Sequence, residues 1–268
     1  MEAHETSEPP PGKIPSWKSP DGSFTKTILE PGSGVDKPKE CAKCTICIEA
    51  VSLPPDQSCY PKGCWFQVEL GEGDTSLEHL VDRCLETMLP GEVCQVDGAL
   101  GFGLILKMAG FENGKETWEL GTEEKIRRAM RDREKGGKAY RDGNIEGAER
   151  RYSRGLRLLV CTPGEAETER VALLANMAAC DLKMGRLREA EERCTLALEK
   201  EPGHLKAFYR RGVARAGMAD WKGAKGDFET LLTLDPGNKE ARRELLRVRE
   251  RDRQEQAQIR KALGKMFL

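Results

Sequence analysis

The sequence has few aromatic residues, no long hydrophobic run and almost no net charge. Aromatic residues make up 6% of the 268 positions and charged residues 33%, a composition that favours exposed amphipathic helices over a fold made mostly of sheet. No stretch of about eighteen apolar residues occurs, so we expect no membrane-spanning helix. The 44 basic and 45 acidic residues leave a net charge of −1. We therefore expect no general attraction to nucleic acid or to anionic membranes.

The start of the chain also lacks the layout of a secretory signal. Residues 1–16 are acidic and rich in proline, instead of basic and then apolar. The segment has too few apolar side chains to bury a core, and we predict a disordered tail. Because no signal is recognisable, the expected location is the cytoplasm, with access to the nucleus left open.

Cysteine, in contrast, is abundant, and half of the ten cysteines lie close together. Without a secretory signal we expect these thiols to stay reduced. The C-x2-C spacings could supply thiolates to zinc, which remains an alternative. However, residues 44–53 continue into further apolar side chains as a buried strand would, so we predict no metal site. The cluster comprises Cys41, Cys44, Cys47, Cys59 and Cys64.

The second half of the chain contains a repeat. Three alanines each precede a bulky or sulfur-bearing residue by four positions, and the last two alanines are 34 residues apart, as are Pro202 and Pro236. This period and the A-x3-F…P pattern are typical of tetratricopeptide (TPR) repeats, in which two helices form each unit. Binding is then expected on the face formed by the first helix of each pair. The alanine pairs are Ala148/Tyr152, Ala190/Cys194 and Ala224/Phe228.

We predict three such repeats over 122–237, at 122–160, 168–202 and 204–236. Ala148 and Ala190 are 42 residues apart, and the excess over 34 matches a longer loop at 161–168. Cys180 and Cys194 fall at packing positions and are expected in the core. His204 is expected to begin its helix.

The last part of the chain, 238–268, is predicted to be a charged helix that caps the array, as terminal repeats require. Its apolar residues are Leu245, Leu246, Val248 and Ile259.

The first half has a different pattern, with short apolar runs separated by glycine and proline. The runs 24–29, 45–53, 64–70 and 104–108 are predicted to be strands. Between the last two lies an amphipathic helix, 76–88, that ends at Pro90-Gly91. These elements predict an antiparallel sheet packed against a single helix.

Several segments carry a family resemblance. Residues 21–24, the Gly32/Gly34 turn, 66–73 and 88–92 follow the order of an FKBP-type prolyl isomerase domain, and 116–122 resembles the joint that leads into a TPR array. The chain from 17 to 268 thus resembles the large FKBP-type immunophilins, which are co-chaperones. The resemblance implies an α+β FKBP-like domain at 17–115, followed by an all-α TPR solenoid with a capping helix.

The resemblance also implies a degenerate isomerase pocket. Phe66 matches one wall aromatic of the active family members, whereas Val81 stands where they have a tryptophan on the floor of the pocket. Leu77-Glu78 stands for a Val-Ile pair, which would place a charge in the pocket. Trp65 is on the wrong strand and is expected to pack locally.

Two further family features are absent. The segment 47–64 has no Phe-Asp pair, and too few residues follow Glu92 for the long hairpin that carries a tyrosine. Prolyl isomerisation has a barrier of about 18–20 kcal/mol and requires a complete apolar pocket. We predict that the domain is not an enzyme and needs no cofactor; an active prolyl isomerase remains the alternative.

For the repeats, the resemblance implies a two-carboxylate clamp for the acidic C-terminal tail of heat-shock protein 90 or 70. The five clamp positions correspond to Arg133, Gly137, Asn176, Lys206 and Arg210. Arg133 keeps the charge of the family's lysine, whereas Gly137 lacks the family's amide. Four positions retain suitable chemistry, so we predict binding that Gly137 weakens.

The residues themselves support a shared ligand. Lys206 and Arg210 lie one helical turn apart and so face the same way. Asn176 lies in the apolar segment 173–179, where a buried amide would need a partner. Solvated charges on an ordinary amphipathic helix are the alternative explanation, and a TPR adaptor for an unrelated ligand is the alternative function.

The sequence therefore predicts a non-enzymatic co-chaperone. Its repeats would bind the tail of heat-shock protein 90, with heat-shock protein 70 as the second candidate, while the FKBP-like domain contacts a client or another partner. Tethering of this kind raises the local concentration of the client near the chaperone. We expect no nucleic acid and no membrane among the partners.

Overall fold

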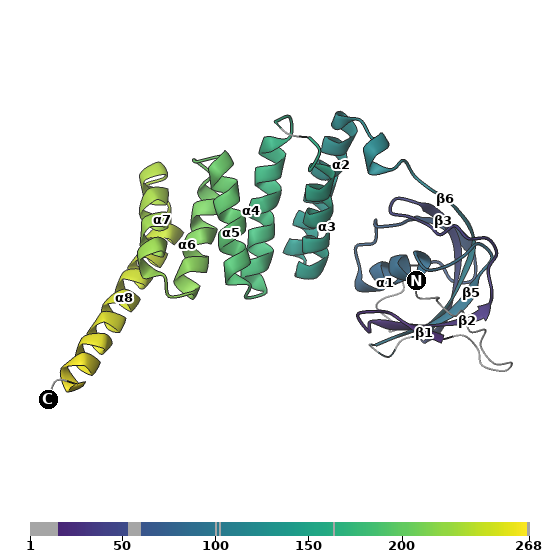
Figure 1. The fold of residues 1–268 in the computed structure, drawn as a ribbon, viewed down its shortest axis with the longest axis horizontal. Coiled ribbons are helices and arrows are strands. Elements are labelled where there is room, and N and C mark those ends of the chain that lie inside the picture. Colours follow the sequence, from purple (N-terminus) through teal and green to yellow (C-terminus); the bar gives the residue numbers. More distant parts are fainter. Residues whose placement is uncertain (1–15, 53–59, 100, 102, 163, 267–268) are drawn as a thin grey trace, which may run out of the picture. The chain divides into compact units, whose positions relative to one another are not determined.

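The computed structural model describes residues 16–52, 60–99, 101, 103–162 and 164–266. The chain divides into two compact units, 1–116 and 117–268. The first contains the sheet and the second the helical array (Figure 1). The N-terminal tail prediction falls outside the described residues.

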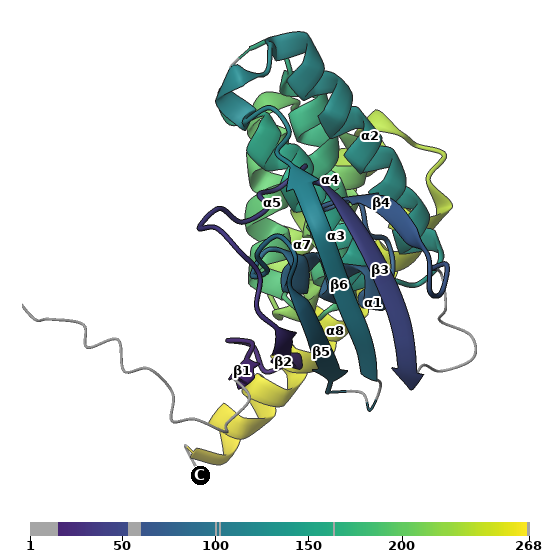
Figure 2. The same ribbon diagram turned by 90° about the vertical axis from the view of Figure 1, so that its right-hand side faces the viewer.

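The first unit is built on one antiparallel sheet, whose strands β5, β6 and β3 lie side by side in Figure 2. Its strand order is β1-β2-β5-β6-β3-β4, so that β1 and β4 form the two edges. The strands are β1 Ser16–Lys18, β2 Phe24–Glu30, β3 Lys43–Ser52, β4 Trp65–Glu69, β5 Val93–Gly98 and β6 Gly103–Glu112.

The helix α1, Ser76–Leu85, packs against this sheet and ends before the expected Met88. It begins with a capping box: Thr75 accepts the backbone N–H of Glu78, and the Glu78 carboxylate accepts the backbone N–H of Thr75. Its apolar face shares one buried core with inward residues of the sheet, among them Phe24 and Ile46.

The structure contains two strands that the sequence patterns do not predict, β1 and β5. The first is three residues long, too short to show a period. The second alternates buried Cys94 and Val96 with more exposed residues, and two buried side chains make a weak signal. The four predicted strands all lie in the sheet, and the predicted fold class is confirmed.

The second unit begins with a short 3-10 helix, η1 Thr117–Glu119, and continues as an array of helices (Figure 1). Consecutive helices pack on one another along the array. The helices are α2 Thr122–Arg141, α3 Ile145–Leu158, α4 Glu167–Lys183, α5 Leu187–Lys200, α6 Leu205–Gly217, α7 Trp221–Leu234 and α8 Lys239–Met266. His204 caps α6 through Nδ1, which accepts the backbone N–H of Ala207 at 3.1 Å, as predicted.

The two helices of each repeat fit together through matched volumes. A Cβ on Gly136 would lie 2.6 Å from the Tyr152 ring, and one on Gly212 would lie 2.8 Å from the Phe228 ring. In the middle repeat the large residue is replaced by buried Cys194, and the corresponding residue of the first helix is Ala178. A small residue on the first helix thus accompanies a larger one on the second, which explains the large residue of the A-x3-F pattern.

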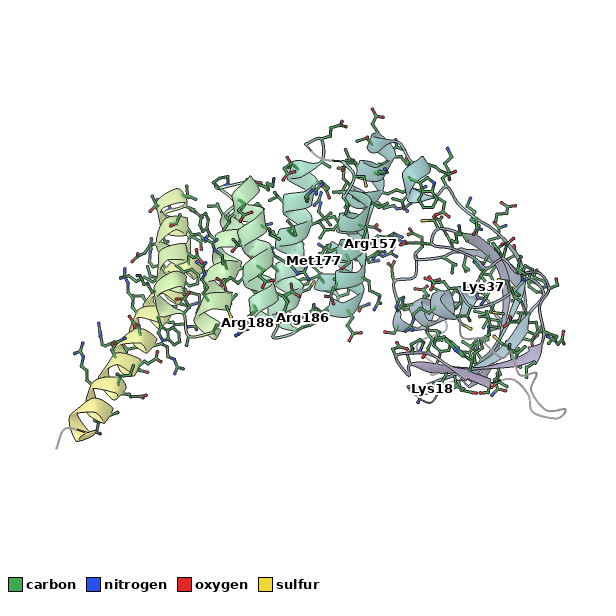
Figure 3. All side chains as sticks on the ribbon, viewed as in Figure 1. Lys18, Lys37, Arg157, Met177, Arg186 and Arg188 are labelled. Carbon is green, nitrogen blue, oxygen red and sulfur yellow. The ribbon has the colours of Figure 1, made fainter. Side chains whose placement is uncertain are left out.

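Each repeat also contains a buried aspartate that pairs with arginine. Arg154 donates through Nε to Asp132 at 2.8 Å. Arg193 donates through Nε to Asp181 at 2.6 Å. Arg186, in the turn between α4 and α5 (Figure 3), also pairs with Asp181 at 2.7 Å. In the third repeat Asp227 pairs with arginines of α6. These cations are already neutralised and are therefore poor candidates for ligand binding.

The capping helix α8 is only partly attached to the array. Ala241, Leu245 and Val248 are buried against the neighbouring helices. The expectation that Leu246 and Ile259 help to cap is wrong, because both side chains are exposed. Within the described residues, no helix combines the length and the apolar character needed to cross a membrane.

Candidate functional site

The helical unit contains a groove of about 530 Å³ that is lined mainly by alternate helices, α2, α4, α6 and α8. These are the first helices of the three repeats and the capping helix, the face on which TPR arrays are expected to bind. Its lining residues are Tyr140, Ala179, Leu182, Lys183, Leu205, Lys206, Tyr209, Arg210, Leu231, Asn238 and Glu240.

The predicted residues Lys206 and Arg210 both line this groove, one turn apart on α6. Lys206 is exposed and forms no hydrogen bond or ion pair with any part of the chain that the structure describes. The Arg210 guanidinium donates through Nη1 to the carbonyl of Ala175, and burial lowers the pKa of Arg210. A partly desolvated cation with no carboxylate partner favours an incoming anion.

Arg210 joins α6 to the segment of α4 that carries Asn176, because its acceptor is the preceding residue. The prediction that Asn176 is buried is wrong: its side chain is half-buried and forms no hydrogen bond to another described residue. Ala175 and Met177 on either side are buried, so Asn176 lies at the margin between packed faces. Its amide can still accept or donate to a ligand.

Arg133 already has a partner. Its Nε lies 2.6 Å from Oε1 of Glu169 in the first turn of α4, and the Arg133 side chain is 32% exposed. It is not among the residues that line the groove. A ligand carboxylate would therefore compete with Glu169 for this cation.

Packing does not require a glycine at position 137, where the family has an amide side chain. A Cβ there would have Arg141 Nη1 at 3.6 Å and the Tyr152 hydroxyl at 3.9 Å as its nearest neighbours. The adjacent Gly136 has no such space, because a Cβ would overlap the Tyr152 ring. A larger residue could thus stand at 137, and the absence of the amide weakens any clamp without a compensating gain in packing.

The groove also contains charged and aromatic residues that the sequence patterns do not single out. Lys183 follows Asn176 by seven residues, a spacing that places both on one face of α4. This spacing is enough to predict Lys183 as a groove residue once Asn176 is assigned. Tyr140 and Tyr209 contribute phenol groups, and Glu240 contributes a carboxylate from α8. Tyr209 follows Lys206 by three residues on α6, a spacing that also places both on one face, whereas Tyr140 and Glu240 come from other helices and could not be assigned from spacing.

The predicted pocket residues of the sheet unit lie in a different environment. Leu77 and Val81 of α1 are buried in the hydrophobic core of the unit. Phe66 of β4 is half-buried and stacks on Tyr60, with ring centroids 5.4 Å apart. These contacts hold the three side chains against the protein itself.

Two expectations about this unit are wrong. Glu78 does not place a charge in a pocket, because its carboxylate accepts the backbone N–H groups of Asp74 and Thr75 at 2.8 and 2.9 Å. Trp65 does not pack locally: it lies on the edge strand β4 and is 55% exposed. Between β5 and β6 only residues 99–102 intervene.

The cysteine cluster is spread over several environments. Cys44 and Cys47 are buried in β3, whereas Cys64 is exposed and Cys41 half-buried. Burial raises the pKa of Cys44 to about 12, which disfavours the thiolate that metal binding needs. Among the described residues, no three histidine, cysteine, aspartate or glutamate side chains are placed to hold a metal ion. Cys59 lies outside the described residues.

A buried acidic group of the sheet unit has a strongly raised pKa. Asp82 of α1 is buried, and its Oδ2 accepts the backbone N–H of Gly71 at 3.0 Å. Burial raises the pKa of Asp82 to about 7, although backbone hydrogen bonds from Gly71 and Gly73 act in the opposite direction. This carboxyl group holds the loop between β4 and α1.

A sheet with one helix, followed by three helix pairs and a capping helix, defines the chain as a TPR-containing protein of the FKBP class. No family model matches the sequence. Over 256 residues the chain is nevertheless 40% identical to "FK506-binding protein-like" of Mus musculus, a match that spans 94% of this chain and 73% of the relative. The chain belongs to the FK506-binding protein-like family.

Two further proteins are similar to the chain. The human "Peptidyl-prolyl cis-trans isomerase FKBP4" is 27% identical over 278 residues, which cover 92% of this chain and 59% of that protein. The C-terminal TPR-containing domain of a Plasmodium falciparum putative FK506-binding protein superposes with a TM-score of 0.50 and 19% identity, over 53% of this chain and 99% of that domain. The second similarity supports the fold of the helical unit.

Proposed function

We propose that the chain is a non-enzymatic co-chaperone whose groove binds the acidic C-terminal tail of heat-shock protein 90, or that of heat-shock protein 70. The sheet unit would contact a client or another partner. The observation that carries the proposal is the groove itself, in which Lys206 and Arg210 stand together without a carboxylate partner among the described residues.

The charges of the groove suit a short acidic peptide. Lys183 and Lys206 are exposed, and Arg210 is fixed by its bond to Ala175 beside Asn176. Charge-assisted hydrogen bonds contribute about 1.5–3 kcal/mol each, so two or three of them supply a large part of the roughly 8 kcal/mol that a micromolar dissociation constant requires. The half-buried amide of Asn176 adds a neutral hydrogen-bonding group.

Two features limit the affinity. Glu169 holds Arg133 and must be displaced or bypassed by a ligand carboxylate. Gly137 contributes no side chain, although its surroundings leave room for one. The proposed site is therefore weaker than a complete five-residue clamp.

Calorimetric titration with the peptide Met-Glu-Glu-Val-Asp tests this proposal. The double substitution Lys206→Glu/Arg210→Glu should abolish binding, whereas Lys222→Glu/Lys225→Glu on α7, outside the groove, should leave it within about twofold. If the wild-type protein and the Lys206→Glu/Arg210→Glu variant bind equally poorly, the groove is not a clamp and the chain serves another ligand.

The absence of isomerase activity is part of the same proposal. It is supported by the packing of Leu77 and Val81 in the core and by the short connection between β5 and β6. Since a 27% identical relative is named a peptidyl-prolyl cis-trans isomerase, activity needs a direct test. In a proline-peptide isomerisation assay we expect the uncatalysed rate; catalysis that Phe66→Ala abolishes would contradict the proposal.

A further inference from the structure

The walls of the groove do not carry the same charge. The charged residues from α4 and α6 are the cations Lys183, Lys206 and Arg210, whereas α8 contributes Glu240. Glu240 is exposed and forms no ion pair with another described residue. The groove is therefore positive along α4 and α6 and negative along α8.

The neighbouring carboxylate on α8 behaves differently. Glu244 pairs with Arg247 at 2.7 Å and with Arg243 at 3.8 Å, so its charge is balanced. Burial raises the pKa of Tyr209; Glu244 and Glu240 add to this rise, and Arg243 and Arg247 oppose it, so charges of both signs from α8 lie near the phenol of this groove residue. Of the two, Glu240 is the carboxylate left for a ligand.

A purely acidic ligand does not explain this arrangement. An acidic tail along the whole groove would bring its own carboxylates next to Glu240, where like charges repel each other. A tail with a cation before its acidic end would match both walls. Packed helices lie about 8–10 Å apart, a distance that an extended chain covers in about three residues.

We propose that Glu240 recognises a basic residue upstream of the acidic end of the bound tail. This inference rests on the proposed binding of an acidic C-terminal peptide to Lys206 and Arg210. It makes α8 a specificity-determining wall as well as a cap. The partner it selects is a tail with arginine or lysine a few residues upstream of its acidic end, as in Ser-Arg-Met-Glu-Glu-Val-Asp, where the arginine stands two and three residues before the two glutamates.

A double-mutant cycle between protein and peptide tests the pairing. The probes are Ser-Arg-Met-Glu-Glu-Val-Asp and Ser-Thr-Met-Glu-Glu-Val-Asp, titrated into the full chain and its Glu240→Gln variant. We expect the wild type to prefer the arginine peptide by about two- to fivefold, the range of an exposed ion pair, and the variant to bind the two equally. Because Glu240 is exposed, the variant should unfold at the wild-type temperature.

Glu250→Gln serves as the matched control, since Glu250 is an exposed carboxylate of α8 outside the groove. It should keep the preference for arginine. If Glu240→Gln raises the affinity for both peptides equally, Glu240 only repels acidic ligands. The inference is then wrong, although the proposed function stands. If neither peptide binds the wild type, the proposed function fails and the inference fails with it.

Discussion

The candidate binding residues of the two units lie in opposite environments. In the sheet unit, Leu77 and Val81 are buried in the core, and Phe66 stacks on a neighbouring ring. In the helical unit, Lys206 is exposed, and among the residues that the structure describes Arg210 has only a backbone acceptor. A side chain that serves packing is not available to a ligand, whereas a cation without a carboxylate partner is. This contrast supports the proposed binding in the groove and a packing role for Leu77 and Val81.

The largest expected effect is on the free energy of unfolding, and it is expected for a substitution at Leu77. Leu77→Ala removes a buried side chain from the core and should lower the free energy of unfolding by about 2–5 kcal/mol. Lys206→Ala, in the exposed groove, should change it by less than about 0.5 kcal/mol. Chemical denaturation monitored by circular dichroism measures both; equal effects would contradict the division of roles.

The next effect concerns pH. Because the pKa of Asp82 is raised to about 7 in the folded protein, the folded state holds its proton more tightly than the unfolded state. The contribution of Asp82 to the stability of the sheet unit should be fully present below pH ~4 and be lost as pH rises towards 7, by on the order of 1.4 kcal/mol per pKa unit. Asp82→Asn should remove this slope. Urea titrations between pH 4 and 8 measure it, and an unchanged slope in the variant would refute the assignment.

Two adjacent glycines provide a smaller effect with a built-in control. Gly136→Ala forces a Cβ against the Tyr152 ring and should destabilise the helical unit by about 1–3 kcal/mol. Gly137→Ala meets no such contact and should stabilise α2 by up to about 1 kcal/mol. Thermal unfolding compares the two variants. Similar melting temperatures would mean that α2 and α3 are not packed as described.

The smallest effect concerns the pair between Arg133 and Glu169. Glu169→Gln releases the guanidinium, and the affinity for Met-Glu-Glu-Val-Asp should rise by a few-fold, as expected for one exposed ion pair. Glu167→Gln, in the same turn of α4, should leave the affinity unchanged. A weaker peptide affinity in Glu169→Gln would show that Glu169 positions Arg133 for binding.

Much of the fold follows from periodic patterns. The 34-residue period places the helix pairs because each repeat joins a small residue to a larger one, as Gly212 joins Phe228. The strand β5 was missed because two buried residues carry too little periodic signal. The capping box of α1 was available in the sequence as Thr75-x-x-Glu78, and it would have corrected the placement of Glu78 in a pocket.

The candidate site was less predictable than the fold. Lys206 and Arg210 share a helix, so their spacing alone places them together. Glu169 and Glu240 belong to other helices, and only the stacking of the array brings the first to Arg133 and the second to the groove. Contacts between distant segments leave no periodic pattern in the sequence, so the positions of these two carboxylates could not be predicted.

The acidic tail is proposed to bind the helical groove and not the sheet unit. Backbone amide chemical shifts of the full chain, recorded while Ser-Arg-Met-Glu-Glu-Val-Asp is added, test it most directly. We predict saturable shifts around Asn176, Lys206, Arg210 and Glu240, with none around Phe66. Shifts centred on Phe66 and α1, with an unperturbed groove, would contradict the account.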